Sequence, residues 1–170
     1  MKKKFNTRVI HSGHGPDKET GAVMPPIHLS STFKQMEPGN FAYEYARTKN
    51  PSRDVLEKLL AQIESGDKAF AFASGMSAIN TVCDLFGTNY HIVCSDDVYG
   101  GTRRLFDKVK SNIDVTYIDF DKNINWNDEI KENTKFIWIE TPSNPLMKII
   151  DIKNTVNIAS EFKLPVICDN

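Results

Sequence analysis

Polar side chains that could do chemistry follow three apolar runs of this chain, at points where strands of a sheet would end. The loop at 140–145 carries a carboxylate, an asparagine and two prolines. The loop at 96–102 carries Tyr99 before two glycines, and a short apolar run ends in Asp169. In open α/β sheets, ligands bind outside the carboxyl ends of the strands. The pattern therefore predicts an active site built from these segments.

Two further segments offer groups that suit a phosphate. The run Ser-Gly-Met-Ser at 74–77 stands where an apolar run turns into a helix, and the first amides of a helix favour an anion. A glycine at such a turn also serves backbone geometry alone. Farther upstream, Tyr45 and Arg47 supply a phenol and a guanidinium fork. Such groups bind phosphate well, and arginine equally often forms a surface salt bridge.

Tyr99 and Asp169 suit a flat cofactor that contains a ring nitrogen. Tyr99 can stack on such a ring, although a loop tyrosine also packs over a sheet edge. A charged Asp169 at the end of a buried strand needs a cation or a protonated ring nitrogen, with a helix N-cap as the alternative role. Together with an asparagine and the two segments that suit a phosphate, these groups are the ones required to bind pyridoxal phosphate. The ring of this cofactor is an electron sink.

The composition argues against several other classes of protein. The 170 residues are 40% hydrophobic and 25% charged with a net charge of -1, which is typical of a soluble globular domain and disfavours nucleic-acid or membrane binding. No apolar run has the length of a bilayer span, and no signal core follows the N-terminus, so we expect a cytoplasmic protein. The glycine patterns of dinucleotide and Walker-type sites are absent, which disfavours a nucleotide-binding domain.

The cysteines and histidines predict no metal site. Cys83, Cys94 and Cys168 are widely spaced in apolar segments, and we interpret them as buried thiols. His11 and His14 stand in a glycine-rich loop without cysteines or carboxylates at metal-site spacing. We therefore expect neither a disulfide framework nor a bound metal.

Strand and helix patterns alternate after residue 50. The expected elements in chain order are a helix from 50 to 63, a strand at 68–73, a helix at 77–86, a strand at 91–95, a helix at 102–110, a strand at 115–118, a helix at 126–131, a strand at 135–140, a helix at 152–162 and a strand at 166–168. Alternation of this kind predicts a mainly parallel sheet with helices on both faces.

Residues 1–50 hold several glycines and prolines and no sustained helical or strand period, which predicts an extended N-terminal arm. A loop of that length is unusual inside a compact domain, so we expect the arm to contact a neighbouring subunit or domain. Residues 51–170 are then predicted to be part of a larger domain, because the sequence stops where a parallel sheet should continue.

The order of these motifs resembles the Cys/Met-metabolism pyridoxal-phosphate enzymes, which include cystathionine γ-synthase, cystathionine γ-lyase, cystathionine β-lyase and methionine γ-lyase. The likeness spans nearly the whole chain, from the runs at 7–13, 20–23 and 26–33 to residues 151–152. It implies the α/β fold of the fold-type-I, aminotransferase-like enzymes, with a C-terminal domain outside this chain. It also implies a homotetramer, a dimer of dimers, with shared active sites.

The resemblance implies the cofactor pyridoxal 5'-phosphate and gives several of the candidate residues a role in binding it. Gly75 and Met76 would bind its phosphate through their backbone amides. Tyr99 would stack on its ring and act as a catalytic group that moves protons, and Asp169 would keep the ring nitrogen protonated.

The remaining candidates also receive roles from the resemblance. Tyr45 and Arg47 would reach the phosphate bound in a neighbouring subunit. Asn144 would contact the ring oxygen side of the cofactor and the substrate carboxylate region, while Glu140 would support its loop. Arg104 aligns with an arginine seen in synthases and γ-lyases and would receive the distal carboxylate of a cystathionine-sized substrate.

The chain also departs from the family pattern. The Schiff-base lysine of the family follows the ring-nitrogen aspartate within a Ser-x-Thr-Lys-like segment, and no such segment occurs here. Lys148 and Lys153 are interpreted as exposed positions around a helix start. Gly101 stands where methionine γ-lyases commonly have a cysteine, which disfavours that activity.

We therefore expect the N-terminal part of a transsulfuration enzyme that carries out γ-elimination or γ-replacement on cystathionine or homoserine-ester substrates. The chain alone is expected to be inactive, because it lacks the lysine. Methionine γ-lyase, cystathionine β-lyase and O-acetylhomoserine sulfhydrylase are the alternatives within the family. A non-catalytic remnant or partner subunit is the alternative outside enzyme function.

Overall fold

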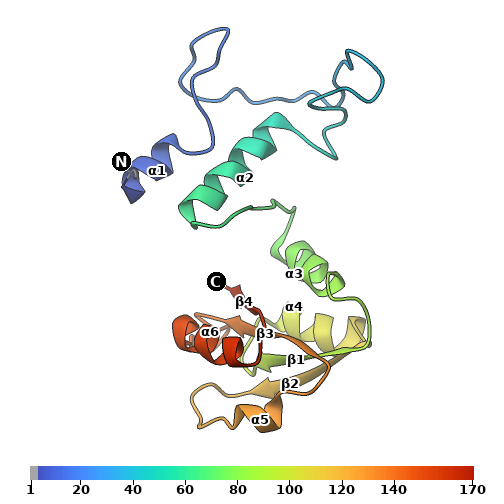
Figure 1. Ribbon diagram of the computed structural model, residues 1–170, viewed down its shortest axis with the longest axis vertical. Helices are drawn as coiled ribbons and strands as arrows, with labels where there is room; N and C mark the ends of the chain where they lie inside the picture. The colour runs from blue at the N-terminus through green and yellow to red at the C-terminus, as the bar shows by residue number, and fades with distance from the viewer. Residues whose placement is uncertain (1–3) are drawn as a thin grey trace. The chain divides into compact units, whose positions relative to one another are not determined.

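The computed structural model describes residues 4–170 (Figure 1). They divide into two compact units, with the boundary between Phe72 and Ala73. The helix that starts after residue 50 belongs to the first unit, so this boundary lies farther along the chain than the end of the predicted arm.

The first unit contains α1 (Phe5–His11) and α2 (Pro51–Ile63). α2 begins where its capping residues predict a helix start. The side chain of Asn50 accepts a hydrogen bond from the Ser52 amide, and Pro51 takes the first helical position, where a missing N–H costs nothing.

The helix α1 was not predicted, because the sequence indicated an extended arm without regular structure over residues 1–50. The seven residues of α1 are too few for a helical period to stand out in the sequence. The helix is instead held by its contact with α2, where the Arg8 guanidinium donates to the Gln62 carbonyl at 2.8 Å. Gly13, at φ +81°, allows the chain after α1 to lie close to α2, because a Cβ there would come within 2.7 Å of the Val55 carbonyl oxygen.

The predicted strand at 68–73 is wrong: the described residues form no strand there. An apolar run becomes a strand only where another strand pairs with its backbone. No ladder in the described part of the chain includes these residues, and Phe70 and Phe72 are exposed. The segment is instead tied to α2 by the Ala71 amide, which donates to the Glu57 carboxylate at 3.0 Å.

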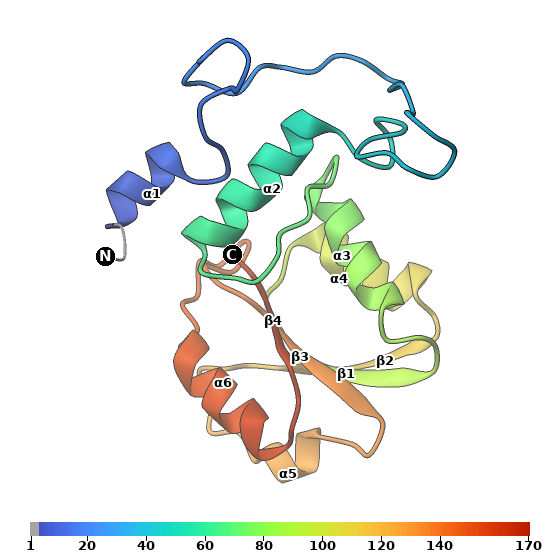
Figure 2. The same ribbon diagram turned by 45° about the horizontal axis from the view of Figure 1, so that its top comes forward.

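The second unit is an α/β layer structure whose elements follow the predicted order. In chain order they are α3 (Gly75–Asp84), β1 (Tyr90–Ser95), α4 (Gly100–Arg104), the π-helix η1 (Leu105–Val109), β2 (Ile113–Ile118), α5 (Trp126–Glu129), β3 (Thr134–Glu140), α6 (Ile152–Glu161) and β4 (Val166–Asp169). The strands within residues 4–170 form one sheet in the order β2-β1-β3-β4, and every pair is parallel (Figure 2). The predicted parallel sheet is confirmed.

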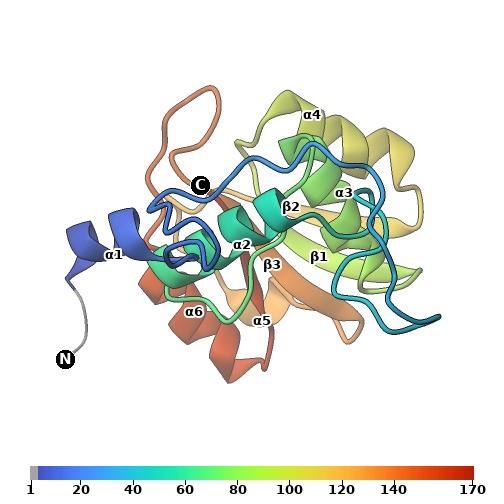
Figure 3. The same ribbon diagram turned by 90° about the horizontal axis from the view of Figure 1, so that it is seen from above.

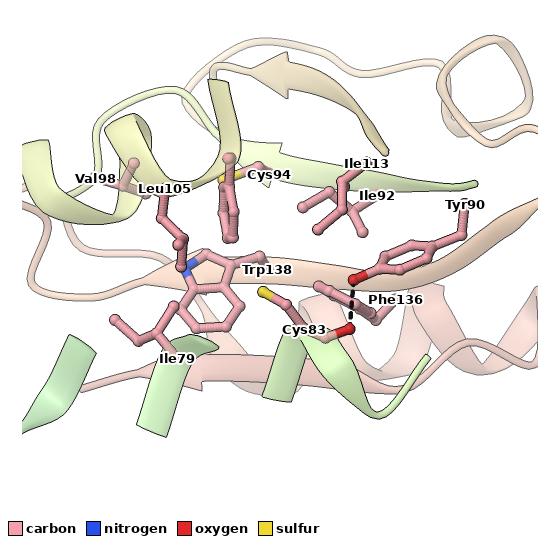
Figure 4. Packing of buried hydrophobic residues seen from close by; sticks show 11 residues of the cluster. Ile79, Cys83, Tyr90, Ile92, Cys94, Val98, Leu105, Ile113, Phe136 and Trp138 are labelled. Carbon is pink, nitrogen blue, oxygen red and sulfur yellow. Dashed lines mark hydrogen bonds between the residues drawn. The ribbon is translucent and has the colours of Figure 1, made fainter. Parts of the chain in front are cut away.

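Helices cover both faces of this sheet. On one face α3, α4 and η1 enclose a cluster around Trp138 and Phe136, and in Figure 4 the Trp138 ring lies near Ile79 and Leu105. On the other face α5 and α6 pack against the alternate residues of the same strands, with Ala159 fully buried. Because both faces of the sheet are covered, the sequences of its strands are nearly continuous apolar runs.

The interpretation of all three cysteines as buried thiols is wrong at one position. Cys83 and Cys94 are buried, but Cys168 is exposed. Cys168 lies on β4, which pairs only with β3 among the described residues, so one side of this strand is open. Burial raises the pKa of the Cys83 thiol to about 11, which makes it an inert core group.

His91 joins three strands from the middle of the sheet. Its ring nitrogens bond the hydroxyls of Thr134 on β3 at 2.7 Å and Thr116 on β2 at 2.9 Å. The imidazole is fully buried. Burial lowers its pKa below the ordinary value of 6.5, and the Lys131 charge lowers it further while Asp114 opposes. The folded protein therefore favours the neutral ring.

We expect the stability contributed by neutral His91 to be complete above the ordinary pKa and to be lost as the pH falls below about 6.5. Urea unfolding of the full-length protein at pH 7.5 and 5.5 measures this loss. A His91→Gln variant lacks the proton uptake, so its midpoint should fall less between the two pH values. An equal fall in both proteins would contradict the prediction.

Candidate functional site

A cavity of about 760 Å³ lies at the carboxyl edge of the sheet in the second unit. It is open to solvent on one side. Its walls come from the start of α3, the loop after β1, the loop after β3 and the end of β4. The lining residues are Ser74, Gly75, Met76, Ile79, Tyr99, Glu140, Pro142, Ser143, Asn144, Pro145, Met147, Asp169 and Asn170. The predicted site residues of all four segments after residue 73 thus meet in one place.

The N-terminus of α3 forms one wall. The Ser74 side chain caps the helix by accepting the Ser77 amide at 3.1 Å. The first amides after the cap, those of Gly75 and Met76, have no intrahelical acceptor and lie on the cavity wall. A Cβ at Gly75 would meet nothing within 4 Å, so the approach to these amides is open. This wall can bind an anion through backbone N–H groups and the helix dipole.

The Tyr99 ring lies in the cavity wall with nearly half of its surface exposed. The ring packs against the backbone of Gly101: a Cβ there would overlap its edge and would come within 3.0 Å of the Met76 sulfur. Gly100 differs, because a Cβ there would meet only the end of the Arg104 side chain, at 3.4 Å. The two glycines after Tyr99 therefore differ, because the space at Gly101 is used by the Tyr99 ring itself.

Glu140, at the end of β3, fixes the backbone that carries this tyrosine. Its carboxylate accepts the Tyr99 amide at 2.8 Å, and the residue is buried. Burial raises the pKa of Glu140, the charges of Asp169 and Asp97 add to this rise, and the Tyr99 amide opposes it. Glu140 therefore supports the Tyr99 loop directly, a contact that the sequence did not suggest.

Asp169 lies beside Glu140, because these two residues are register partners on neighbouring parallel strands. The Asp169 residue is half-buried, and burial raises the pKa of its carboxyl group. Within residues 4–170 no salt bridge or side-chain hydrogen bond reaches this carboxylate. Among the described residues the Asp169 side chain caps no helix, and its carboxylate on the cavity wall has no cationic partner there.

Asn144 stands in the loop between β3 and α6, the orange segment that Figure 3 shows leaving the end of β3. Its side chain lies on the cavity wall and is exposed. The preceding Ser143 is buried, and its hydroxyl donates to the Asp97 carboxylate of the loop after β1. The Asn144 loop is therefore attached to the Tyr99 loop.

The other predicted site residues lie outside the cavity lining. Arg104 is exposed at the end of α4. Tyr45 and Arg47 belong to the first unit, where the guanidinium lies 4.9 Å from the centre of the tyrosine ring. Lys148 is not the exposed lysine that the sequence indicated, since its ammonium contacts Asp96 and Asp119 and its side chain is mostly covered.

Sequence reasoning missed Asp97 and Ser143 as parts of this site. The available signal was the pair of aspartates directly after a buried strand, because a carboxylate at a sheet edge needs donors nearby. The donors come from a loop that lies 46 residues away in the sequence, so no local pattern revealed them.

The described residues also bear on metal and membrane binding. No group of three or more histidine, cysteine or acidic side chains in residues 4–170 is arranged to hold a metal ion. None of the described helices is long and apolar enough to cross a bilayer.

Comparisons with known proteins point to one family. A family model described as "Cys/Met metabolism PLP-dependent enzyme" matches residues 6–170. The chain is 46% identical over 173 residues to cystathionine gamma-lyase of Bacillus subtilis, covering 100% of this chain and 45% of the relative. It is 42% identical over 173 residues to cystathionine beta-lyase of Coxiella burnetii, covering 99% of this chain and 45% of the relative.

A solved structure shares the fold. Cystathionine gamma-lyase of Lactobacillus plantarum, complexed with L-serine, superposes with a TM-score of 0.92 at 44% identity, over 99% of this chain and 45% of that one. The chain thus spans slightly less than half the length of the relatives it matches.

Proposed function

Because the chain belongs to the family of Cys/Met metabolism PLP-dependent enzymes, we propose that the whole protein is a pyridoxal-phosphate enzyme of transsulfuration. It carries out γ-elimination or γ-replacement on cystathionine or homoserine-ester substrates. The observation that carries the proposal is the cavity that brings together the α3 amides, Tyr99, Asn144 and Asp169.

The residues of the cavity fit this cofactor on three counts. Asp169 offers a half-buried carboxylate with a raised pKa and, within the described chain, no cationic partner, which suits a protonated ring nitrogen. The amides at the start of α3 suit a phosphate. The exposed part of the Tyr99 ring suits a stacked aromatic ring.

When bound, pyridoxal phosphate supplies an electron sink for carbanions of an amino-acid substrate. Gly75 and Met76 hold its phosphate. Asp169 keeps its ring nitrogen protonated and so maintains that sink. The Tyr99 hydroxyl moves protons at the substrate. Asn144 contacts the side of the cofactor ring that carries the ring oxygen, and it orients the substrate carboxylate. The role of Arg104 as the ligand of a distal substrate carboxylate stays a proposal.

Tyr99 can act in this way only if its ring keeps its position. That position depends on Gly101, because a Cβ at residue 101 would overlap the ring. We expect Gly101→Ala to weaken pyridoxal phosphate binding about tenfold, because overpacking of this kind costs about 1–3 kcal/mol. The dissociation constant of the full-length protein is measured by absorbance titration. Gly100→Ala makes the same change in the same helix without meeting the ring and should stay within about twofold. Equal effects of the two substitutions would contradict this reading of Gly101.

The proposed activity has two possible forms, which differ in whether cystathionine is cleaved at its γ- or its β-carbon. The similar proteins named above are two γ-lyases, at 46% and 44% identity, and one β-lyase, at 42% identity. Cystathionine β-lyase is therefore the second candidate. Methionine γ-lyase is disfavoured by the glycine at position 101.

We further propose that the protein works as a homotetramer with shared sites. The loop after α1 exposes large apolar side chains that a second copy would cover, with Ile27 at 82% and Leu29 at 90% exposure. Tyr45 and Arg47 of this unit would reach a phosphate bound by a neighbouring copy. Sedimentation of the full-length protein tests the assembly. A cytoplasmic location stays a prediction from the sequence.

The test of the proposed function uses the full-length protein loaded with pyridoxal phosphate and given L-cystathionine. Release of cysteine with 2-oxobutyrate indicates γ-cleavage, and homocysteine with pyruvate indicates β-cleavage. Formation of cystathionine from cysteine and a homoserine ester indicates γ-replacement. If the loaded protein yields none of these products, the proposal is wrong.

A further inference from the structure

The Asn144 loop and the Tyr99 loop brace each other. At the end of β3, directly before the Asn144 loop, the Glu140 carboxylate accepts the Tyr99 amide at 2.8 Å. In the Tyr99 loop, one oxygen of Asp97 accepts two bonds, from the Ser143 hydroxyl and from the Leu146 amide at 3.0 Å. The Glu140 carboxylate at the end of β3 thus fixes the backbone of the Tyr99 loop, and the Asp97 carboxylate of the Tyr99 loop fixes the Asn144 loop.

The Asp97 contacts enclose Asn144 in the sequence. Ser143 directly precedes it and Leu146 follows it by two positions, so both flanks are attached to the same carboxylate. The chain of bonds extends further, because the Ser143 hydroxyl also accepts the Lys148 amide at 2.9 Å. Ser143 is 1% exposed, which protects the two bonds of its hydroxyl from competition by water, whereas the Leu146 bond is exposed.

A charge cluster holds the far end of the same loop. The Lys148 ammonium lies 2.9 Å from the carboxylate of Asp119 and 3.3 Å from that of Asp96, at the ends of β2 and β1. Its side chain is 22% exposed, so the lysine serves as a tether to the sheet edge. The backbone of the loop is therefore held at Ser143, at Leu146 and at Lys148.

We propose that Asp97 is a positioning residue, which holds the Asn144 side chain at the cavity wall by fixing Ser143 and Leu146. The inference rests on the proposed function, in that Asn144 is there the group that meets pyridoxal phosphate. Asp97 is not part of the cavity lining, so it acts on the cofactor only through the loop.

The first test needs no cofactor. Hydrogen exchange of the full-length protein, stripped of pyridoxal phosphate, follows peptides that cover residues 141–150. Asp97→Ala removes the acceptor of the Leu146 amide, and we expect exchange in this segment to speed up about tenfold. Asp97→Asn keeps an acceptor oxygen and should restore most of the protection. Asp128→Ala, on an exposed aspartate of α5, is the matched control and should change nothing in this segment. Unchanged exchange in Asp97→Ala would overturn the inference.

The second test measures the dissociation constant for pyridoxal phosphate. We expect Asp97→Ala to raise it about tenfold, in line with one charge-assisted hydrogen bond, with rescue by Asp97→Asn. Ser143→Ala should act in the same direction, and the double variant should be no weaker than the worse single variant, because both changes break one chain of bonds. A faster loop with an unchanged dissociation constant would overturn the positioning role.

The two tests keep this inference apart from the proposed function. If the wild-type full-length protein fails to bind pyridoxal phosphate, the proposed function and the positioning role both fall. The exchange measurement then still decides whether Asp97 holds the loop. If the wild type binds and the Asp97 variants exchange and bind like it, only the present inference falls.

Discussion

Replacing Asp169 by asparagine is expected to weaken the binding of pyridoxal phosphate to the full-length protein by about thirtyfold or more. The Asp169 carboxylate is half-buried and its pKa is raised by burial, so it gains much from a cationic partner. Removing one partner of a buried charge pair costs about 2–5 kcal/mol, which sets the size of the effect. Turnover should fall at least as much, because the ring nitrogen loses the group that keeps it protonated.

Absorbance titration with the cofactor, followed by turnover at saturating cofactor, separates the two losses. Asp128→Asn makes the same chemical change on α5, outside the cavity, and should leave both values unchanged. An Asp169→Asn protein that binds the cofactor with wild-type affinity would show that Asp169 does not pair with the ring nitrogen.

Replacing Trp138 by alanine is expected to cost about 3–5 kcal/mol in the free energy of unfolding. Trp138 is 2% exposed at the centre of the cluster that joins β3 to α3 and η1 (Figure 4). Its ring meets Phe106 edge-on with a centroid distance of 5.6 Å. Its loss would leave a large cavity in the cluster against which Met76 packs. Urea unfolding of the full-length protein measures the change.

Trp138→Phe provides the matched comparison. The indole N–H is buried without a hydrogen-bond partner among the described residues, so removing it breaks no bond. Phenylalanine also keeps much of the ring in the core, and the loss of stability should be well under half that of Trp138→Ala. Equal losses in the two variants would contradict this account of the packing.

The sequence predicted α2 and most elements of the second unit correctly because their signals are local. The capping side chain of Asn50 and the apolar run that ends at Glu140 need no knowledge of distant residues. Where a signal depended on a partner, prediction failed. The run at 68–73 is apolar, but no strand of the described chain pairs with it. Cys168 is exposed on an apolar strand that pairs on one side only within the described residues.

The residues of the cavity divide in the same way. Polar groups at strand ends identified Tyr99, Asn144 and Asp169 as candidates, since all strands of a parallel sheet end at one edge. Their supports were not visible. Asp97 bonds Ser143 across 46 residues, and Glu140 bonds the Tyr99 amide across 41.

By itself, the sequence determined the order of the elements in the second unit, the family and the edge of the sheet where the site lies. These follow from periods of side chains, from caps and from short motifs, all of which act within a few residues. Only the tertiary structure decided which loop braces which, that the Tyr99 ring fills the space at Gly101, and that Lys148 is tethered to two strand ends. The physical reason is the strand order β2-β1-β3-β4, which makes neighbours of β1 and β3 although β2 lies between them in the chain.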